Sequence, residues 1–258
     1  TKTYAERQLD VVLISSGIND AAPPLQAAFN AVIQGQRGGK VSIKANSIFP
    51  VGSVVSISGD ALIVIDSEGD GKSARPQLRM VSGDHAIFRF EIGARDSVIQ
   101  NLWLTHNSSS ISGTGLIEFA GTNRDVKVKN IDFYDFDNNR GDCVKISATS
   151  GSVFRLWFED CQAVGFEKMI YTVVPASGSL GYFMNDINFD KMYANGSRKF
   201  IAVNCGVQGA FEGNSFRTCK MQSTSGSSHM FDYETEHSGN SRYTRLFDCI
   251  YWDSVAGA

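Results

Sequence analysis

Six short segments of this chain share one pattern, in which two apolar residues are separated by a single position. The first apolar residues of the six pairs are Phe88, Ile117, Val144, Tyr171, Ile201 and Phe231, with steps of 29, 27, 27, 30 and 30 residues. Apolar residues two apart place one face of each strand inward. Repeats of this length made of short strands are typical of a solenoid, whose unit cannot bury its apolar face alone. The sequence therefore predicts an all-β fold, a right-handed parallel β-helix.

Two further ladders of apolar residues support this interpretation. The second ladder consists of Leu104, Phe133, Phe158, Phe189, Phe216 and Leu246. The third ladder lies three residues behind it and consists of Asn107, Phe136, Cys161, Met192, Cys219 and Cys249. We expect Phe136, Cys161, Met192 and Cys219 to be buried and stacked. Stacked side chains have near-parallel Cβ vectors, a poor geometry for a disulfide, so all five cysteines are predicted to be reduced.

The segment before the regular coils predicts a lid for the solenoid. Leu25, Ala28, Phe29 and Val32 recur at the spacing of an amphipathic helix, which we expect to run from Pro24 to about residue 33. We therefore divide the chain into an N-terminal lead-in with a capping helix, residues 1–40, and a β-helix, residues 41–258. The sequence ends directly after a core strand, so we expect either a cover from outside the chain or a truncated C-terminus.

Composition excludes several classes of function. The net charge is −3, which argues against a broad basic surface for nucleic acid. No run of 18 or more apolar residues occurs, so we expect no membrane insertion. The four histidines form neither an HxH nor an HExxH motif, and there is no P-loop or GxGxxG. We accordingly predict no metal site and no cofactor.

The opening of the chain resembles a known family. Residues 20–53 read DAAPPLQAAFNAV and then, after a short gap, GGKVSIKANSIFPVGS. This order of acidic turn, helix, glycine pair and strand is similar to the start of pectin-lyase-fold proteins, and most of all to that of bacteriophage tailspikes. The resemblance implies a β-helix that binds or cleaves acidic or cell-surface polysaccharide. It also implies a homotrimer, since the tailspikes of this family are trimeric.

A weaker likeness lies at residues 140–153, RGDCVKISATSGSV, which resemble a stretch of polygalacturonases. Asp142 matches one of that family's two catalytic aspartates, and Arg198-Lys199 falls where its substrate-binding Arg and Lys lie. The partner aspartate and the NTD motif are missing, and Met169 stands where that family has the His of its GHG motif. The likeness therefore supports the fold more than a shared chemistry.

In a β-helix, function must use outward side chains that stack about 4.8 Å apart on successive coils. One residue beyond the second ladder lie Thr105, Tyr134, Glu159, Asp190 and Arg217, and the next position holds His106, Asp135, Asp160, Lys191 and Thr218. We predict that Glu159 with Asp190, and Asp135 with Asp160, form pairs of catalytic carboxylates. Two adjacent carboxylates suit the acid and base of glycoside cleavage. Tyr134 and Arg217 would bind the sugar. The alternative is a solvated face with aspartates in ordinary turns.

A reserve site lies two residues before the first ladder. Its residues are Asp142, Met169, Lys199 and His229, with Arg140, Lys168 and Arg198 close by. Asp142 and His229 are the reserve catalytic residues, and Lys199 and Arg140 would bind an anionic sugar by their charge. The alternative is a stripe of surface salt bridges.

An apolar stripe is expected on the outside of the solenoid, one residue before each member of the first ladder. It consists of Ile87, Leu116, Cys143, Ile170, Phe200 and Met230. Six outward apolar side chains are costly in water. They predict either a homotrimer interface along the solenoid axis or a surface that the chain's own loops cover.

Together these features predict a phage tailspike-like protein that binds and cleaves bacterial cell-surface polysaccharide, by hydrolysis or by β-elimination. It would act outside the cell as part of a virion tail. The alternatives are a binding-only adhesin module and a secreted, pectinase-like bacterial enzyme. The first residues, TKTYAERQLD, lack the apolar segment of a signal peptide, and the cysteines are expected to be free. Both features favour the first two hypotheses over the third.

Overall fold

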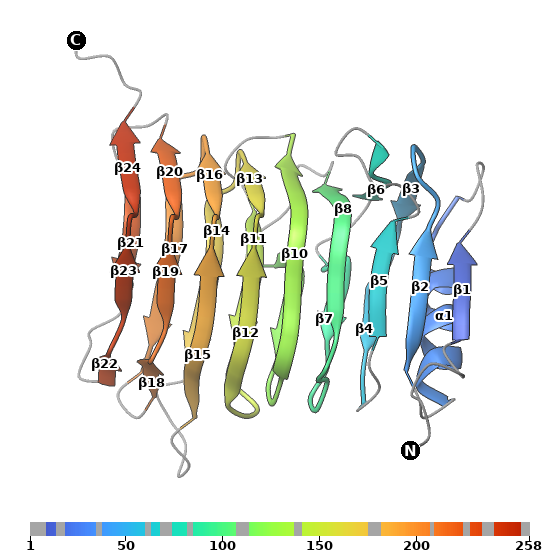
Figure 1. The fold of residues 1–258 in the computed structure, drawn as a ribbon, viewed down its shortest axis with the longest axis horizontal. Coiled ribbons are helices and arrows are strands. Elements are labelled where there is room, and N and C mark those ends of the chain that lie inside the picture. The colour runs from blue at the N-terminus through green and yellow to red at the C-terminus, as the bar shows by residue number, and fades with distance from the viewer. Residues whose placement is uncertain are drawn as a thin grey trace, which may run out of the picture.

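The computed structural model confirms a parallel β-solenoid with a helix near its N-terminus (Figure 1). It describes residues 9–13, 19–34, 38–59, 63–67, 74–81, 85–106, 114–136, 141–174, 182–206, 209–223, 228–233 and 240–253. Neighbouring coils pair in parallel from one end of the stack to the other. The colours of Figure 1 follow the chain from blue to red along the solenoid axis, so each coil contacts the coils before and after it.

The described strands form two sheets, of 17 and of 7 strands. The larger sheet contains β1 (Leu9–Leu13), β2 (Gly39–Ile43), β3 (Ile48–Val51), β5 (Ile63–Ser67), β6 (Gln77–Met80), β8 (Val98–His106), β10 (Arg124–Asp135), β12 (Val153–Glu159), β13 (Gln162–Val164), β15 (Phe183–Asp190), β16 (Tyr193–Asn195), β18 (Ala210–Glu212), β19 (Ser215–Arg217), β20 (Lys220–Ser223), β22 (Asn240–Arg242), β23 (Arg245–Phe247) and β24 (Ile250–Asp253). The smaller sheet contains β4 (Val55–Ile57), β7 (Phe88–Phe90), β9 (Gly115–Ala120), β11 (Asp142–Ser147), β14 (Lys168–Val174), β17 (Lys199–Cys205) and β21 (His229–Tyr233).

Helix α1 (Ala22–Gln34) lies where the sequence predicts the capping helix. Leu25, Ala28, Phe29 and Val32 are buried, and the Phe29 ring packs 6.2 Å from that of Phe88 on β7. The four residues share one face because the helix repeats every 3.6 residues. The helix thereby extends the apolar core at the N-terminal end of the solenoid (Figure 1). The domain boundary at residue 40 stays a prediction.

The larger sheet has two recurrent positions with left-handed backbone in each coil. The earlier position includes Asp96, Asp125, Arg155 and Asp186, and we call the later one the bend. The bend residues are Asn101, Asn130, Asp160, Lys191, Thr218 and Asp248, and all six have left-handed backbone with φ between 51° and 59°. Left-handed backbone is uncommon outside glycine, and Asn and Asp adopt it most readily. The bend separates β12 from β13 and β15 from β16, so the outer surface continues around it from one strand row to the next.

Among the side chains that the structure describes, the first ladder is confirmed except at one coil; the side chain of Tyr233 lies outside them. Val144 on β11 pairs with Ile170 on β14, and Ile170 pairs in turn with Ile201 on β17. Ile170 is buried, and so is Thr172. The expected inward pair, Tyr171 and Val173, is therefore wrong by one residue, and a slip of one residue moves a side chain to the opposite face.

The second ladder predicted from the sequence combines residues that the structure places in two separate ladders, one on each side of the bend. Phe158 pairs with Val128 on the preceding coil, whereas Phe133 pairs with Ala163, which lies beyond the bend. The ladder before the bend contains Val41, Ile65, Ile99, Val128, Phe158, Phe189, Phe216 and Leu246. The ladder beyond the bend contains Phe49, Leu78, Leu104, Phe133, Ala163, Ala194, Met221 and Tyr251.

The third ladder is confirmed for Cys161, Met192 and Cys219, which are buried, and it is wrong for Phe136, which is 52% exposed. Phe136 follows the strand beyond the bend, so the shifted register that misplaces Phe133 misplaces it as well. All five cysteines are free, as predicted. Burial raises the pKa of the Cys161 and Cys219 thiols to about 12.

The apolar stripe predicted on the outside lies inside. Ile87, Leu116, Cys143 and Phe200 are at most 1% exposed, as is Ile170, which belongs to the first ladder itself. Each of the four stands at the start of a strand of the smaller sheet, where two consecutive side chains are both buried. Met230 is partly buried and packs against the same core. The surface that motivated a trimer interface is therefore part of the core.

Candidate functional site

The structure brings Glu159 and Asp190 together as predicted. Glu159 ends β12 and Asp190 ends β15, and the two residues are direct partners in the parallel register. The column continues to Lys129 on one side and to Arg217 on the other. Since adjacent strands lie about 4.8 Å apart, four charged side chains follow one another along the solenoid axis. The order is cation, carboxylate, carboxylate, cation.

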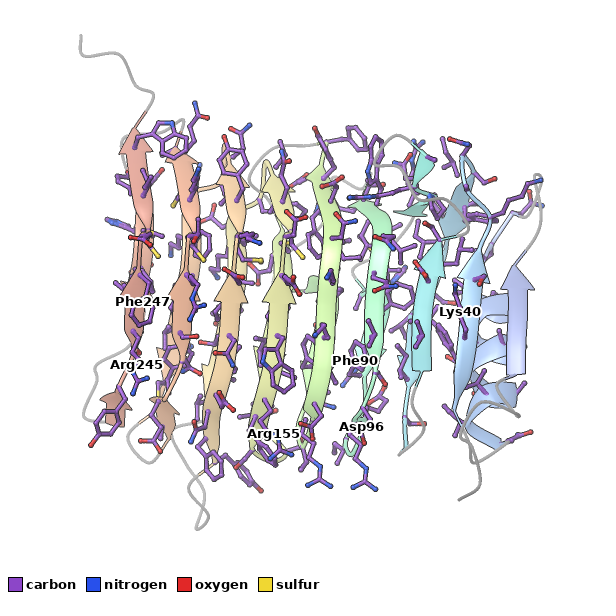
Figure 2. All side chains as sticks on the ribbon, viewed as in Figure 1. Lys40, Phe90, Asp96, Arg155, Arg245 and Phe247 are labelled. Carbon is purple, nitrogen blue, oxygen red and sulfur yellow. The ribbon has the colours of Figure 1, made fainter. Side chains whose placement is uncertain are left out.

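The two carboxylates have different surroundings. Glu159 Oε1 lies 3.3 Å from Lys129 Nζ, and the Glu159 side chain is 33% exposed. Asp190 Oδ1 is buried and has no hydrogen-bond partner among the described residues. An acceptor buried without a donor costs free energy. The guanidinium of Arg217 lies 5.8 Å from the ring of Phe247, which ends the column on the last coil (Figure 2).

An indole stands beside these carboxylates. Trp157 precedes Glu159 by two positions on β12, so both side chains leave the same outer face. It is partly exposed, and its register partners are Lys127 and Asn188. Asn188 Oδ1 accepts a hydrogen bond from Ser215 Oγ at 2.5 Å. Strand alternation could have identified Trp157 from the sequence, whereas Lys129 requires the correct register.

Together Lys129, Trp157, Glu159, Asp190 and Arg217 form what we call the carboxylate face. The Trp157 ring can stack on a sugar ring, and the two carboxylates, with the neighbouring amide of Asn188, can bind the sugar hydroxyls. Two carboxylates in unlike surroundings can also divide the roles of acid and base between them.

The structure does not place Tyr134 in this face. Tyr134 pairs with Thr105 and Val164, on the strand row beyond the bend, so it does not share a column with Arg217. The expected pair of Asp135 and Asp160 is also wrong. Asp160 is an exposed bend residue, whereas Asp135 is buried at the end of β10.

Asp135 belongs to a buried polar pair instead. Its Oδ1 lies 3.5 Å from Nδ1 of His106, its partner on β8, and both side chains are at most 1% exposed. The ring of Phe166 packs edge-on against His106 with the ring centroids 5.6 Å apart. This pair lies in the interior, where a polysaccharide has no access.

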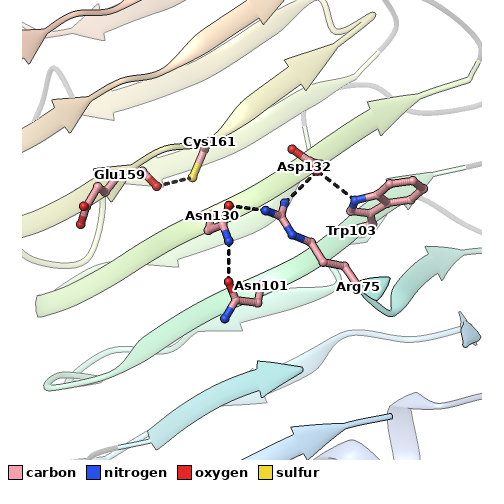
Figure 3. A network of polar contacts seen from close by, with 7 residues as sticks. All are labelled: Arg75, Asn101, Trp103, Asn130, Asp132, Glu159 and Cys161. Atoms are coloured by element: carbon pink, nitrogen blue, oxygen red, sulfur yellow. Dashed lines mark hydrogen bonds and ion pairs between the residues drawn. The ribbon is translucent and has the colours of Figure 1, made fainter. Parts of the chain in front are cut away.

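A salt-bridged polar network fixes the bend near this region (Figure 3). Arg75, whose side chain is 2% exposed, donates to Asp132 Oδ2 at 2.8 Å and also to Asn130. The Trp103 indole donates to the same Asp132 oxygen at 2.9 Å, and Asn130 bonds to Asn101 on the preceding coil. Figure 3 shows Glu159 one coil further along, where its carbonyl accepts from the Cys161 thiol. The network holds successive coils together beside the carboxylate face.

The reserve site is a ladder of ion pairs. Asp142 pairs in register with Lys168, not with Met169, which is buried in the core. Lys168 Nζ lies 3.9 Å from Asp142 Oδ1, and Lys199 Nζ lies 2.6 Å from Asp232 Oδ2. His229 follows in the same column and is exposed, while Arg140 lies outside the described residues. These contacts are salt bridges, as in the alternative, but Asp142 is buried, so the stripe is not confined to the surface.

Two negative findings concern other kinds of function. Within the described ranges, no group of three or more His, Cys, Asp and Glu side chains could hold a metal ion. In the same ranges, no helix is both long enough and apolar enough to cross a membrane.

Comparisons with protein-family models and with curated sequences gave no match. Solved structures gave several. A Parabacteroides merdae protein assigned as a glycosyl hydrolase is 16% identical, with a TM-score of 0.50 over 94% of this chain and 97% of that one. An alginate lyase from a Paenibacillus species is 12% identical, with a TM-score of 0.52 over 92% and 97%. This chain has the pectin-lyase fold.

The tailspike of the Escherichia coli bacteriophage HK620 also matches, at 12% identity and a TM-score of 0.46, over 94% of this chain and 60% of the tailspike. Of these matches, the two with a TM-score of at least 0.50 are the glycosyl hydrolase and the alginate lyase. Identities this low concern the fold, so the activity has to be argued from the site itself.

Proposed function

We propose that the protein binds and cleaves a polysaccharide on the carboxylate face, with Glu159 and Asp190 as the two catalytic carboxylates. The observation that carries the proposal is their direct pairing on adjacent coils, with Trp157 on the same outer surface. The likeness of the fold to those of a glycosyl hydrolase and an alginate lyase supports it. A chain lying along the solenoid axis would cross both carboxylates in succession.

The surroundings of the carboxylates suggest a division of roles. Lys129 balances the charge of Glu159, so we assign Glu159 as the ionised carboxylate that acts as nucleophile or base. Asp190 is the partner of Glu159 on the next coil, so we assign it as the proton donor to the leaving oxygen. Strands about 4.8 Å apart favour the short carboxyl separation of retaining glycosidases over the wider spacing of inverting ones. Trp157 would stack on the sugar, and Arg217 would bind it by charge.

The resemblance of residues 20–53 to phage tailspikes supports a finer proposal. The substrate would be a bacterial cell-surface polysaccharide, and the protein would act outside the cell on a virion tail. A homotrimer rests on this resemblance alone, because the stripe that first suggested it is buried. A secreted bacterial enzyme with the same fold is the alternative source.

The ion pair between Lys129 and Glu159 favours a second candidate function. A carboxylate whose charge is balanced by a neighbouring lysine can bind a ligand without taking part in bond cleavage. The protein would then be a binding-only adhesin module that uses the same face. The two functions differ in whether bonds are broken, so product formation separates them.

The test is incubation with a panel of capsular and O-antigen polysaccharides. Reducing ends report hydrolysis, and absorbance near 235 nm reports the unsaturated product of β-elimination. On a substrate that the parent protein cleaves, we expect Glu159→Gln and Asp190→Asn each to lower turnover on the order of 10³-fold while binding remains. Glu212→Gln is the matched control, because Glu212 is a partly exposed acid outside this column.

Near-full activity in both Glu159→Gln and Asp190→Asn would refute the assignment. Binding without any product across the panel would favour the adhesin function. Trp157→Ala separates the binding role from the chemistry, since we expect it to raise KM far more than it lowers kcat.

A further inference from the structure

A hollow of about 370 Å³ lies beyond the bend from the carboxylate face. Five residues line it, Lys191, Met192, Tyr193, Thr218 and Lys220. Lys191 and Thr218 are bend residues on adjacent coils, while Tyr193 and Lys220 are register partners on β16 and β20. Lys191 directly follows Asp190, so the hollow begins where the carboxylate face ends.

The two lysines of the hollow differ from those of the carboxylate face and the reserve site. Lys191 and Lys220 are exposed, and neither forms an ion pair within the described residues. By contrast, Lys129, Lys168 and Lys199 each lie within 4 Å of a carboxylate oxygen. Two uncompensated ammonium groups on neighbouring coils attract a negative group placed between them.

The hollow also presents an aromatic ring held in a fixed position. The Tyr193 ring stacks on that of Trp252, with centroids 6.1 Å apart and planes inclined by 20°. Its hydroxyl donates to Gln222 Oε1 at 2.9 Å. A ring held at both its face and its hydroxyl loses little conformational freedom when a ligand packs against it. Met192, which also lines the hollow, is buried and adds an apolar side chain.

We propose that this hollow is a subsite for an acid-substituted sugar, such as a uronate. The ammonium groups of Lys191 and Lys220 would bind its carboxylate, and the Tyr193 ring would cover the apolar face of the sugar. The Thr218 hydroxyl is placed to bond to a sugar hydroxyl. The inference takes its class of ligand, a glycan, from the proposed function, and it implies that the glycan continues around the bend from Asp190.

The test uses tetragalacturonate as the anionic probe and maltotetraose as the neutral one. Titration calorimetry measures affinity, and the amide resonances of Lys191, Tyr193, Thr218 and Lys220 report the place of binding. We expect tetragalacturonate to bind and to shift these resonances, and maltotetraose to bind at least tenfold more weakly. Added salt should weaken the binding of tetragalacturonate only.

The matched variants are Lys191→Asn, which keeps a residue tolerant of left-handed backbone, and Lys220→Gln. Each removes one charged contact, so we expect about a tenfold loss of affinity for tetragalacturonate from each. Lys44→Gln is the control, since Lys44 is an exposed lysine on an early coil and should leave the affinity unchanged.

Equal binding of both probes, the absence of binding, or resonance shifts confined to residues outside the hollow would each overturn the proposal. The double variant Glu159→Gln/Asp190→Asn separates this inference from the proposed function. We expect that variant to retain tetragalacturonate binding. If no polysaccharide is cleaved but tetragalacturonate still binds through Lys191 and Lys220, the catalytic assignment fails and the subsite stands.

Discussion

The Phe189 side chain should be among the most costly to truncate in this chain. Its ring stacks between Phe158, at 5.1 Å and 14°, and Phe216, at 4.6 Å and 12°. It is 1% exposed, and the coils on both sides fix its neighbours. We therefore expect Phe189→Ala to leave a cavity that the two stacked strands cannot close.

The magnitude follows from burial and stacking. Truncating a buried Phe to Ala costs about 3–5 kcal/mol, and each stacked pair contributes about 0.5–1.5 kcal/mol beyond its area. Two such pairs place Phe189→Ala at the upper end, about 5 kcal/mol. That is comparable with the whole stability of many domains, which is about 5–15 kcal/mol.

Urea unfolding followed by circular dichroism measures this loss. Leu246→Ala is the matched control, because Leu246 continues the same ladder but is 53% exposed on the last coil. We expect it to cost about 1 kcal/mol, since little apolar area returns to water. Equal costs for the two variants, or a Phe189→Ala cost below about 1 kcal/mol, would refute the ladder as the source of stability.

The thiols and two ion pairs can be tested separately. At pH 8 an alkylating reagent should modify Cys249 far faster than Cys161, because the raised pKa of the buried Cys161 thiol leaves little thiolate. Mass spectrometry measures the two rates, and equal rates would contradict this expectation. Arg155 lowers the pKa of Asp125, so the pair stabilises the fold above the ordinary carboxyl pKa and less as pH falls through the lowered one; the stability advantage over Asp125→Asn should shrink in acid denaturation. Arg75→Met should destabilise the fold by about 3 kcal/mol in urea unfolding, since it leaves Asp132 without its buried ion-pair partner.

Much of the fold could be predicted from the sequence because a period of nearly 30 residues survives local errors. The first-ladder residues of β9, β11 and β17 can be found from apolar residues two positions apart, although Leu116, Cys143 and Phe200 beside them are buried as well. Alternation could not decide whether Ile170 or Tyr171 points inward. Each is the first of two strand-favouring residues two positions apart, Ile170 with Thr172 and Tyr171 with Val173. Likewise, Phe133 and Phe158 are both inward aromatics, but they lie on opposite sides of the bend.

The candidate site shows the same limits. Glu159 and Asp190 can be paired from the sequence because β12 and β15 belong to coils whose second-ladder residues, Phe158 and Phe189, are true register partners. Tyr134 cannot be placed in this way. The second ladder predicted from the sequence takes Phe133 from this coil, whereas the true register partner of Phe158 is Val128, five residues earlier. The same error conceals Lys129, the register partner of Glu159. The burial of Asp135 beside His106 depends on contacts between coils, which linear spacing does not contain.

The regular spacing of the bend residues means that a whole coil can be inserted or removed as one unit. These residues recur at steps of 29, 30, 31, 27 and 30 residues, so a whole coil inserted between two of them would keep every ladder in phase. An extra coil between β12 and β15 would leave the fold intact yet double the spacing of Glu159 and Asp190 to ~9.6 Å. Duplication of a coil could thus lengthen the solenoid without disturbing the fold, but at the junctions that join Lys129, Glu159, Asp190 and Arg217 it would separate the residues of the site.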